Sequence, residues 1–164
     1  MLLSASSSSS RFKLTKNIYE NPNTPSNFCT ILRKYLIGGI IQNIEQINND
    51  RIIVFKIKNF DELGYEKYYY LITELMGKHS NIILTDDNKV IIESLKNSYS
   101  IDYKRSTIAN MNYILPPTES KYNPFDFDSY KNLEFNYSDK RFLMKNFYGV
   151  SALLNNYFIA RQTE

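Results

Sequence analysis

The sequence predicts an α+β protein: an antiparallel β-sheet lobe with one packed helix, followed by C-terminal helices. Strand-like stretches succeed one another between residues 40 and 95, with short turn-rich connectors and no helical segment between them. That pattern is typical of an antiparallel meander. A helical period appears once before this block and again after residue 138. The 164 residues are enough for one domain with a core, or for one domain and part of a second.

The chain begins with two expected short strands, at residues 2–5 and 12–14, joined by a serine-rich loop. The second strand has the alternating pattern of a β-strand. The serines at 6–10 have two interpretations: a plain polar turn, or an anion site made by hydroxyl and backbone N–H groups.

The clearest helix lies between Pro25 and the glycine pair at 38–39. Thr24 or Ser26 can cap its start, and glycine tolerates the positive φ that often ends a helix. Arg33 and Lys34 lie off the apolar face, as a solvated surface and as favourable charge near the helix C-terminus. The apolar residues share one face at helical spacing: Phe28, Ile31, Leu32, Tyr35 and Leu36.

The meander is predicted from five segments, at 40–47, 51–58, 65–73, 81–85 and 89–95. The last two are joined by a hairpin turn in which we expect Asn88 to adopt the left-handed conformation. Consecutive prolines at 116–117 cannot join a ladder and end the block.

The corner between the third and fourth segments reads ELMGKHSN, at residues 74–81, and holds the only histidine. We expect Gly77 to supply a backbone angle that other residues resist. His79, Ser80 and Asn81 can then satisfy backbone groups left free at the turn, so that His79 pins the corner. A second interpretation is an RNA contact, because histidine stacks on bases and Lys78 lies beside it.

The organisation expected from these signals is a β-rich lobe at 1–117, a linker at 118–137 and the start of a helical region at 138–164. Polar residues, a further proline and the lack of periodicity indicate the linker. In the helical region, Gly149 separates two apolar stretches. Nothing in the sequence pairs with their apolar faces, so we expect further helices to complete this region.

Catalytic chemistry is not indicated. Cys29 is the only cysteine, so an intrachain disulfide is excluded. Cys29 and the single histidine do not make a convincing catalytic dyad. The stretch at 126–134 resembles the start of a calcium loop but lacks its turn glycine. We therefore expect no enzyme, no metal and no cofactor. No apolar run is long enough to span a membrane, and the N-terminus lacks a signal-peptide pattern, which favours the cytoplasm.

Asp50 and Arg51 open the second strand of the meander and have two interpretations. In one, Asp50 ends a turn with a local backbone hydrogen bond while the stem of Arg51 lies along the sheet edge. In the other, Arg51 contacts a phosphate or a base and Asp50 orients its guanidinium. The net charge of +3 is compatible with an anionic partner without requiring one.

Six motifs in the same order resemble the NFACT proteins, long labelled fibronectin-binding protein A. The corner ELMGKHSNIIL resembles the family's hallmark strand-turn-strand, and Asp50-Arg51 resembles its aspartate-arginine strand. The remaining four are the early strands LLSASSSSSRFKLT, the helix with Leu32-Arg33-Lys34, the segment YKRSTIANMNYILPP with Arg105 and Tyr113, and FYGVSALLNNYFIAR. Asn110 stands where the family pattern has a glycine, and asparagine also visits positive φ.

This resemblance implies a lobe similar to the N-terminal lobe of formamidopyrimidine-type DNA glycosylases, without their chemistry, followed by a helix-hairpin-helix-like middle region. It also implies a role in ribosome-associated quality control. Family members bind a large ribosomal subunit carrying a stalled peptidyl-tRNA, recruit tRNA and support C-terminal tailing of the nascent chain, with alanine in bacteria.

The resemblance assigns tRNA handling to Asp50 and Arg51. Further possible RNA contacts are Arg33, Lys34, Lys78, His79 and Arg105, and we expect these cations to gather with Arg51 on one positive surface. Two alternatives remain open. One is a surface adhesin for fibronectin or fibrinogen, which would reach the cell surface without a signal peptide; the other is a scaffold that only holds neighbouring domains.

Overall fold

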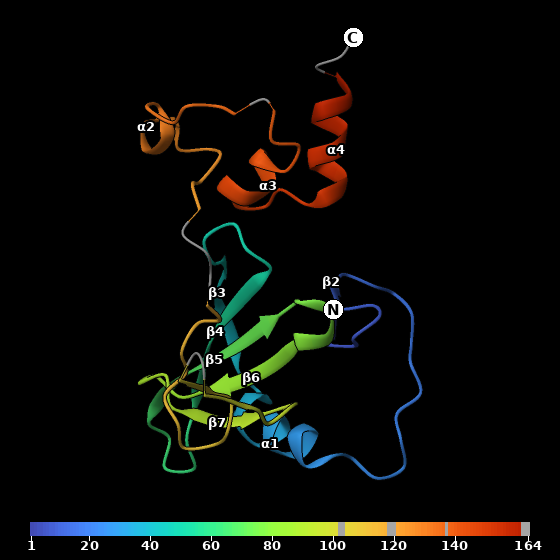
Figure 1. The fold of residues 1–164 in the computed structure, drawn as a ribbon. Helices are drawn as coiled ribbons and strands as arrows, with labels where there is room; N and C mark the ends of the chain where they lie inside the picture. The colour runs from blue at the N-terminus through green and yellow to red at the C-terminus, as the bar shows by residue number, and fades with distance from the viewer. Residues whose placement is uncertain (102–103, 118–120, 137, 162–164) are drawn as a thin grey trace. The chain divides into compact units, whose positions relative to one another are not determined.

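The computed structural model describes residues 1–101, 104–117, 121–136 and 138–161. It divides into two compact units (Figure 1). The first contains residues 1–47 and 51–116, and the second contains residues 48–50 and 117–164. The protein is α+β, with its main sheet in the first unit and most of its helices in the second.

The main sheet confirms the predicted antiparallel meander. Its neighbours follow chain order, β3-β4-β5-β6-β7, and each adjacent pair is antiparallel. The strands are β3 (Ile40–Gln46), β4 (Ile52–Phe60), β5 (Glu66–Glu74), β6 (Asn81–Thr85) and β7 (Ile91–Ser94). The long β4–β5 pair forms the centre, while β3 is an edge strand whose residues are all exposed.

One face of the sheet is covered by α1 (Asn27–Leu36) and by a small hairpin of β1 (Leu2–Ser4) and β2 (Arg11–Lys13). Buried Phe55 and Leu71 from the sheet form the centre of this core. The other residues packed there include Leu3, Ala5, Phe12, Phe28, Leu32, Leu36, Ile53, Ile57 and Ile82. This arrangement accounts for the apolar stripe of α1, which lies against the sheet.

The helix ends as the sequence predicts. Ser26 is the N-cap, and its hydroxyl accepts a hydrogen bond from the Cys29 backbone N–H at 3.2 Å. After the last turn, Gly38 has a φ of +80°, the left-handed geometry that glycine adopts without a Cβ penalty.

The opposite face is covered near one end by the chain that follows β7. This segment carries the short pair β8 (Tyr99–Ser100) and β9 (Arg105–Ser106) and then bonds back onto the sheet. The Asn110 N–H donates to the Ile91 carbonyl at 2.8 Å, and Asn110 has a φ of +66°. Asparagine thus takes the position where the family pattern has glycine. Tyr113 and Met76 pack on the second core, which contains Ile52, Ile72, Ile83 and Ile91.

The β6–β7 hairpin differs from the prediction in one residue. Lys89, with a φ of +62°, adopts the left-handed conformation in place of Asn88. The Lys89 N–H donates to the Asp86 carbonyl, and the register shifts just before the turn. A turn followed by a left-handed bulge residue explains the change, because the positive φ then falls on the fourth residue of the turn.

The second unit contains α2 (Phe127–Tyr130), α3 (Phe142–Asn146) and α4 (Ala152–Arg161). Gly149 separates α3 from α4, as the sequence predicts, and has a φ of +73°. Buried Phe147 contacts the rings of Tyr122, Tyr130 and Phe135. Described parts of the expected linker therefore have packed aromatic side chains.

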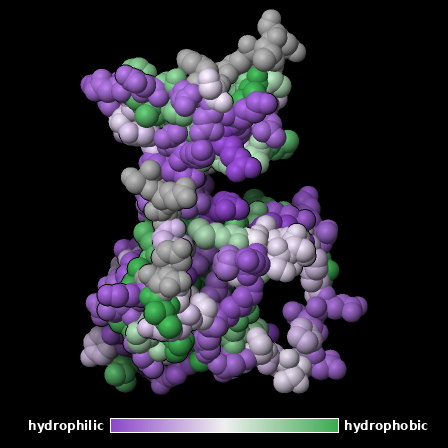
Figure 2. All heavy atoms as spheres, viewed as in Figure 1, coloured by the Kyte–Doolittle hydropathy of each residue, from purple (hydrophilic) through white to green (hydrophobic). Residues whose placement is uncertain are grey.

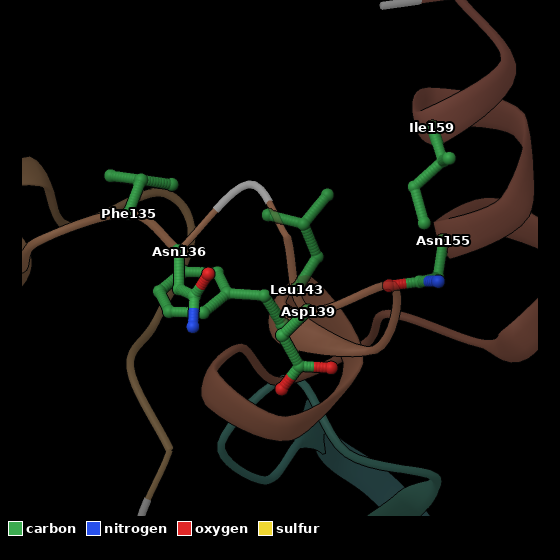
Figure 3. Close-up of a pocket in the computed structure, with 7 residues that line it drawn as sticks. Phe135, Asn136, Asp139, Leu143, Asn155 and Ile159 are labelled. Carbon is green, nitrogen blue, oxygen red and sulfur yellow. The ribbon is translucent and has the colours of Figure 1, made fainter.

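A small cavity of about 30 Å³ lies in the second unit between α3, α4 and the chain before them (Figure 3). Buried Asn155 lines it and is held in place: its Nδ2 donates to the Lys140 carbonyl at 2.7 Å, and its Oδ1 accepts from the Met144 N–H at 3.3 Å. The volume suits one or two water molecules rather than an organic ligand.

Candidate nucleic-acid interface

Three segments meet at one end of the sheet, here called the Arg51 end. Ile52 pairs with Glu74, and Glu74 pairs with Asn81, so the start of β4, the end of β5 and the start of β6 lie together. The Leu75 N–H also donates to the Arg51 carbonyl at 2.8 Å. The aspartate-arginine motif and the ELMGKHSN corner are therefore neighbours in space.

The corner itself is a single turn of 3₁₀-helix, η1 (Gly77–His79). Gly77 has a φ of +55°, as expected for the glycine of this turn. The side chains of Lys78 and His79 are exposed, and so is that of Arg51. The Arg51 end thus presents a guanidinium, an ammonium and an imidazole from two adjacent segments.

Asn81, and not His79, pins the corner. The buried Asn81 amide accepts hydrogen bonds from the backbone N–H groups of Ile82 and Lys96, both at 2.9 Å, and donates to the Lys96 carbonyl at 2.8 Å. The imidazole of His79 is exposed and makes no hydrogen bond to another described residue. The Ser80 hydroxyl is buried and, among the described residues, has no partner. The predicted pinning role is therefore wrong for His79, whose ring is accessible to a ligand.

The serine-rich loop approaches the same corner. A Cβ on Gly77 would lie 4.0 Å from the Ser7 carbonyl oxygen. The ammonium of Lys96 anchors the start of the loop by donating to the Ala5 carbonyl at 2.8 Å. The loop therefore lies beside Lys78 and His79, although residues 7 and 77 are far apart in sequence.

A buried polar cluster lies beneath this end. Glu74 is 1% exposed, and its Oε1 accepts hydrogen bonds from the Arg105 guanidinium and from the Tyr113 hydroxyl, the latter at 2.9 Å. The Arg105 Nε also donates to the Ile114 carbonyl at 2.7 Å. These bonds tie the segment that follows β7 to the end of β5.

The electrostatics of this cluster follow from its burial. Burial raises the pKa of Glu74, while the positive charge of Arg105 and the Tyr113 hydroxyl oppose that increase. Burial, followed by the nearby Glu74 charge, raises the pKa of Tyr113, so its phenol remains a proton donor.

The cluster gives Arg105 an internal partner, in contrast to the expectation that it lies on an open positive surface. Only 14% of its side chain is exposed, and its guanidinium is paired with Glu74. Glu74 is the residue that we missed at the sequence level. A signal was present, because alternation places Glu74 on the same face as Ile72 and Tyr70, at the end of a buried run.

Arg33 and Lys34 lie at the opposite end of the sheet. The end of α1 is held there by Asn59, whose Nδ2 donates to the carbonyls of Tyr35 and Ile37. Asn59 and Ile52 are near opposite ends of β4, whose nine residues span roughly 25 Å. The expected single surface is therefore split, with Arg51, Lys78 and His79 at one end and Arg33 and Lys34 at the other.

Asp50 precedes Arg51 in the chain and is half-buried. It belongs to the turn at 48–50, in which Asn48 and Asn49 both have positive φ, at 51° and 54°. The turn closes the β3–β4 hairpin, with the Ile47 N–H donating to the Ile52 carbonyl at 3.0 Å.

The described residues contain no group of three or more His, Cys, Asp or Glu side chains placed to hold a metal ion. No helix in the described part of the chain is long and apolar enough to cross a membrane.

Known proteins resemble this chain over nearly its whole length. A family model described as the NFACT N-terminal and middle domains matches residues 1–163, so the chain belongs to the NFACT family. Among its relatives is RqcH of Bacillus subtilis, an Rqc2 homolog, which is 43% identical over 160 residues. That match covers 93% of this chain and 28% of RqcH. RqcH of Streptococcus suis is 43% identical over 136 residues, covering 82% of this chain and 25% of that protein.

Solved structures show the same fold. The N-terminal domain of the fibronectin-binding protein PavA from Streptococcus pneumoniae superposes with a TM-score of 0.86 at 36% identity, over 98% of this chain and 62% of that one. The N-terminal part of the fibronectin/fibrinogen-binding protein from Streptococcus suis superposes with a TM-score of 0.84 at 37% identity. That match covers 96% of this chain and 61% of the other. The chain therefore spans about a quarter of the curated relatives and about three fifths of these structures.

Proposed function

We propose that this chain is the tRNA-contacting part of a ribosome-associated quality control factor. The factor acts on large ribosomal subunits that carry a stalled peptidyl-tRNA, and it supports C-terminal alanine tailing of the nascent chain. Membership of the NFACT family and the similarity to Rqc2 homologs support this proposal. The role is binding and positioning in the cytoplasm, without catalysis, metal or cofactor.

One observation carries the proposal: the hydrogen bond between the Leu75 N–H and the Arg51 carbonyl, which brings the two family motifs side by side at 2.8 Å. The three exposed basic groups there have complementary uses. The Arg51 guanidinium can form paired hydrogen bonds with a phosphate or a guanine edge. Lys78 adds a point charge for phosphate, and His79 offers a ring for stacking on an unpaired base.

The domain organisation is part of the proposal. Residues 1–117 form the RNA-contacting lobe, 118–137 join the two parts, and 138–164 begin the helical middle region. Asp50 precedes Arg51 in the turn that leads into β4, and orienting the guanidinium is the role proposed for its carboxylate. Lys34 and Arg33 are too far from the Arg51 end to contact the same few nucleotides, so they serve here as controls.

The test is binding of deacylated tRNA to the full 164-residue chain over a salt series from 50 to 200 mM. Each phosphate contact contributes about 0.9 to the slope of log affinity against log salt. We expect Arg51→Ala to weaken binding about tenfold or more and to lower the slope by about one. Arg33→Ala removes the same charge at the opposite end and should change affinity little.

Equal loss in both variants would contradict a localised interface and indicate only non-specific attraction by the net charge. Unchanged binding in Arg51→Ala, with the fold intact by circular dichroism, would place tRNA recognition outside this lobe. The same pair of variants tested on large ribosomal subunits carrying peptidyl-tRNA separates tRNA contact from subunit contact.

A second function has one specific observation in its favour: solved structures of close fold and 36–37% identity come from proteins described as fibronectin- or fibrinogen-binding. The fully exposed edge strand β3 offers a route, because an extended partner segment can add to a sheet edge. Surface plasmon resonance with fibronectin tests it. Binding that survives Arg51→Ala and is lost when proline replaces Ile44 in β3, whose N–H faces away from β4, would support this function as separate from RNA binding.

A further inference from the structure

The aspartate-arginine motif lies at a sequence boundary between the two units of the chain. Residues 1–47 and 51–116 belong to the first unit, whereas the turn Asn48–Asp50 belongs to the second, together with residues 117–164. Asp50 and Arg51 are therefore assigned to different units although they are consecutive residues. The contacts that the turn makes within the second unit consequently bear on Arg51, the residue on which the proposed tRNA interface depends.

Within the second unit, Asn49 is contacted through both its side chain and its backbone. Its Nδ2 donates a hydrogen bond to the Asn123 Oδ1 at 2.9 Å, and this bond is partly buried. A Cβ on Gly149 would lie 3.7 Å from the Asn49 carbonyl oxygen, so the backbone of Gly149 passes close to that carbonyl. A side-chain bond and a backbone contact therefore hold the turn Asn48–Asp50 in one conformation.

Asn123 is itself fixed in place. Its Oδ1 also accepts a hydrogen bond from the Phe125 N–H at 3.0 Å. The preceding residue, Tyr122, forms a parallel β-bridge with buried Phe147, whose ring lies in the aromatic core of the second unit. Asn123 thus offers Asn49 an acceptor whose position is set by the core of the second unit.

The turn has a backbone geometry that residues with a Cβ adopt only at a cost. Asn48 and Asn49 both have positive φ, at 51° and 54°. Asparagine tolerates this left-handed conformation better than most residues, but it is still less favourable than an ordinary negative φ. The hydrogen bond between Asn49 and Asn123 offsets part of that cost and favours this conformation of the turn over its alternatives.

The backbone of Arg51 is held by the sheet on one side and by the turn on the other. Its carbonyl oxygen accepts a hydrogen bond from the Leu75 N–H at 2.8 Å, and β4 begins at the next residue. Its nitrogen is joined to Asp50, so the turn decides how firmly this side is fixed. Paired hydrogen bonds from a guanidinium need a defined direction, and ordering a mobile segment on binding costs affinity.

We propose that Asn49 and Asn123 are positioning residues for the Asp50–Arg51 pair. Their amide-to-amide hydrogen bond holds the turn in the conformation from which the Arg51 guanidinium contacts tRNA. The inference rests on the proposed tRNA-binding function and extends it, because it gives a role to two residues that do not touch the RNA. By thermodynamic linkage, tRNA bound at Arg51 in turn stabilises the bond between Asn49 and Asn123.

The first measurement is binding of deacylated tRNA to the full chain at one salt concentration. Asn49→Gly keeps the positive φ accessible and deletes the amide, and we expect it to weaken binding about fivefold. Asn48→Gly makes the same change one residue earlier, outside the bond to Asn123, and should leave affinity within about twofold of the wild type. Asn123→Ala should match Asn49→Gly, and the double variant should bind no more weakly than either single variant.

The second measurement needs no tRNA and reports on the backbone beside Arg51. In ¹⁵N NMR spectra of the free chain, Asn123→Ala should shift the amide signals of Asp50 and Arg51 and lower their heteronuclear NOE values, because the turn gains freedom. Asn136→Ala is the matched control, since it removes an asparagine amide that bonds only locally, to the Ser138 N–H, and should leave those two signals in place. General destabilisation of the second unit would not single out these two amides.

The outcomes separate this inference from the function on which it rests. Unchanged binding in Arg51→Ala would overturn the proposed function. Loss of binding in Arg51→Ala together with wild-type affinity in Asn49→Gly would overturn the positioning role alone. The positioning role is also contradicted if the Asp50 and Arg51 amides do not respond to Asn123→Ala, or if that substitution weakens binding equally in the Arg51→Ala background, because it would then act by another route.

Discussion

The two ends of the five-stranded sheet are completed differently. At the Arg51 end, the segment after β7 covers one face, and the Glu74 carboxylate, the Arg105 guanidinium and the Tyr113 hydroxyl form a buried network beneath exposed basic groups. At the opposite end, here called the hairpin end, residues 66–69 of β5 have no described strand on the β6 side, and both acidic and basic side chains lie beside them. One end is supported by a buried polar network, and the other leaves part of β5 paired on one side only.

This difference bears on what each end of the sheet is suited to bind. A surface that positions a polyanion needs its cations fixed by a well-packed support. A strand-pairing site needs the opposite, namely backbone groups left without a neighbour. In the space-filling view, hydrophobic residues are scattered among hydrophilic ones on the visible face (Figure 2). On that face, polar chemistry and not one large apolar patch therefore distinguishes the surfaces.

The largest effect is expected from Arg105→Ala, which tests whether the Arg51 end depends on its buried network. The change leaves the Glu74 carboxylate buried without its cation and should lower the free energy of unfolding by about 3–5 kcal/mol in urea denaturation. Arg33→Ala removes an exposed arginine and should change it by less than about 0.5 kcal/mol. Similar small losses in both variants would show that water reaches Glu74 and that the network adds little.

The next largest effect is expected in the ELMGKHSN corner, where two substitutions separate the role of Asn81 from that of His79. Asn81→Ala removes three hydrogen bonds and takes away the acceptor of the Ile82 and Lys96 backbone N–H groups, so stability should fall by about 1–3 kcal/mol. His79→Ala should be neutral in stability, within about 0.5 kcal/mol, yet should weaken tRNA binding. A large stability loss in His79→Ala would restore the structural role that the contacts assign to Asn81.

The same corner shows how much of the structure could be predicted from the sequence. The strands and α1 follow from local period, and Gly38, Gly77 and Asn110 have the positive φ that the sequence indicated. Neighbouring residues could not show whether His79 or Asn81 holds the turn in place, because the partner of Asn81 is Lys96, 15 residues away. A polar residue in a turn has several possible partners, and only the register of β6 and β7 decides among them.

The candidate site was predictable to a similar degree. The resemblance places Arg51 and the ELMGKHSN corner in one family pattern, but their contact depends on the β4–β5 register. Arg105 looked like a free cation since its acidic partner, Glu74, lies 31 residues earlier. Lys34 was assigned to the same surface because linear sequence does not reveal which end of a sheet a crossing helix reaches.

A smaller effect is expected at the hairpin end, where Gly38 and Gly39 follow α1. A Cβ on Gly39 would lie 2.8 Å from the Ile57 Cγ2 and 3.0 Å from the Leu36 carbonyl oxygen. Gly39→Ala should therefore cost about 2 kcal/mol through displacement of a core side chain. Gly38 has open space around it but a positive φ, so Gly38→Ala should cost about 1 kcal/mol. Thermal unfolding of both variants checks the order, and the reverse order would mean that α1 shifts easily on the sheet.

The smallest effect is the pH dependence that Glu74 adds. Burial raises its pKa above the ordinary 4.5, so on raising the pH the unfolded chain releases this proton before the folded protein does. Stability from this group is fully present below the unfolded pKa and is lost as the pH rises through the folded value. The free energy of unfolding of the wild type, measured in urea, should therefore decrease above pH 4.5 relative to that of Glu74→Gln, whose amide does not titrate.

The sign of that difference decides which force dominates at the Arg51 end. If the stability of the wild type relative to Glu74→Gln instead increases with pH, the charge of Arg105 outweighs burial, and the pKa of Glu74 is lowered. Removing the guanidinium separates the two forces further. In Arg105→Ala the opposing charge is gone, so the pKa of Glu74 should rise further, and a carboxyl ¹³C titration should detect it. A pKa that does not move would mean that the ion pair is too well solvated to support the basic surface above it.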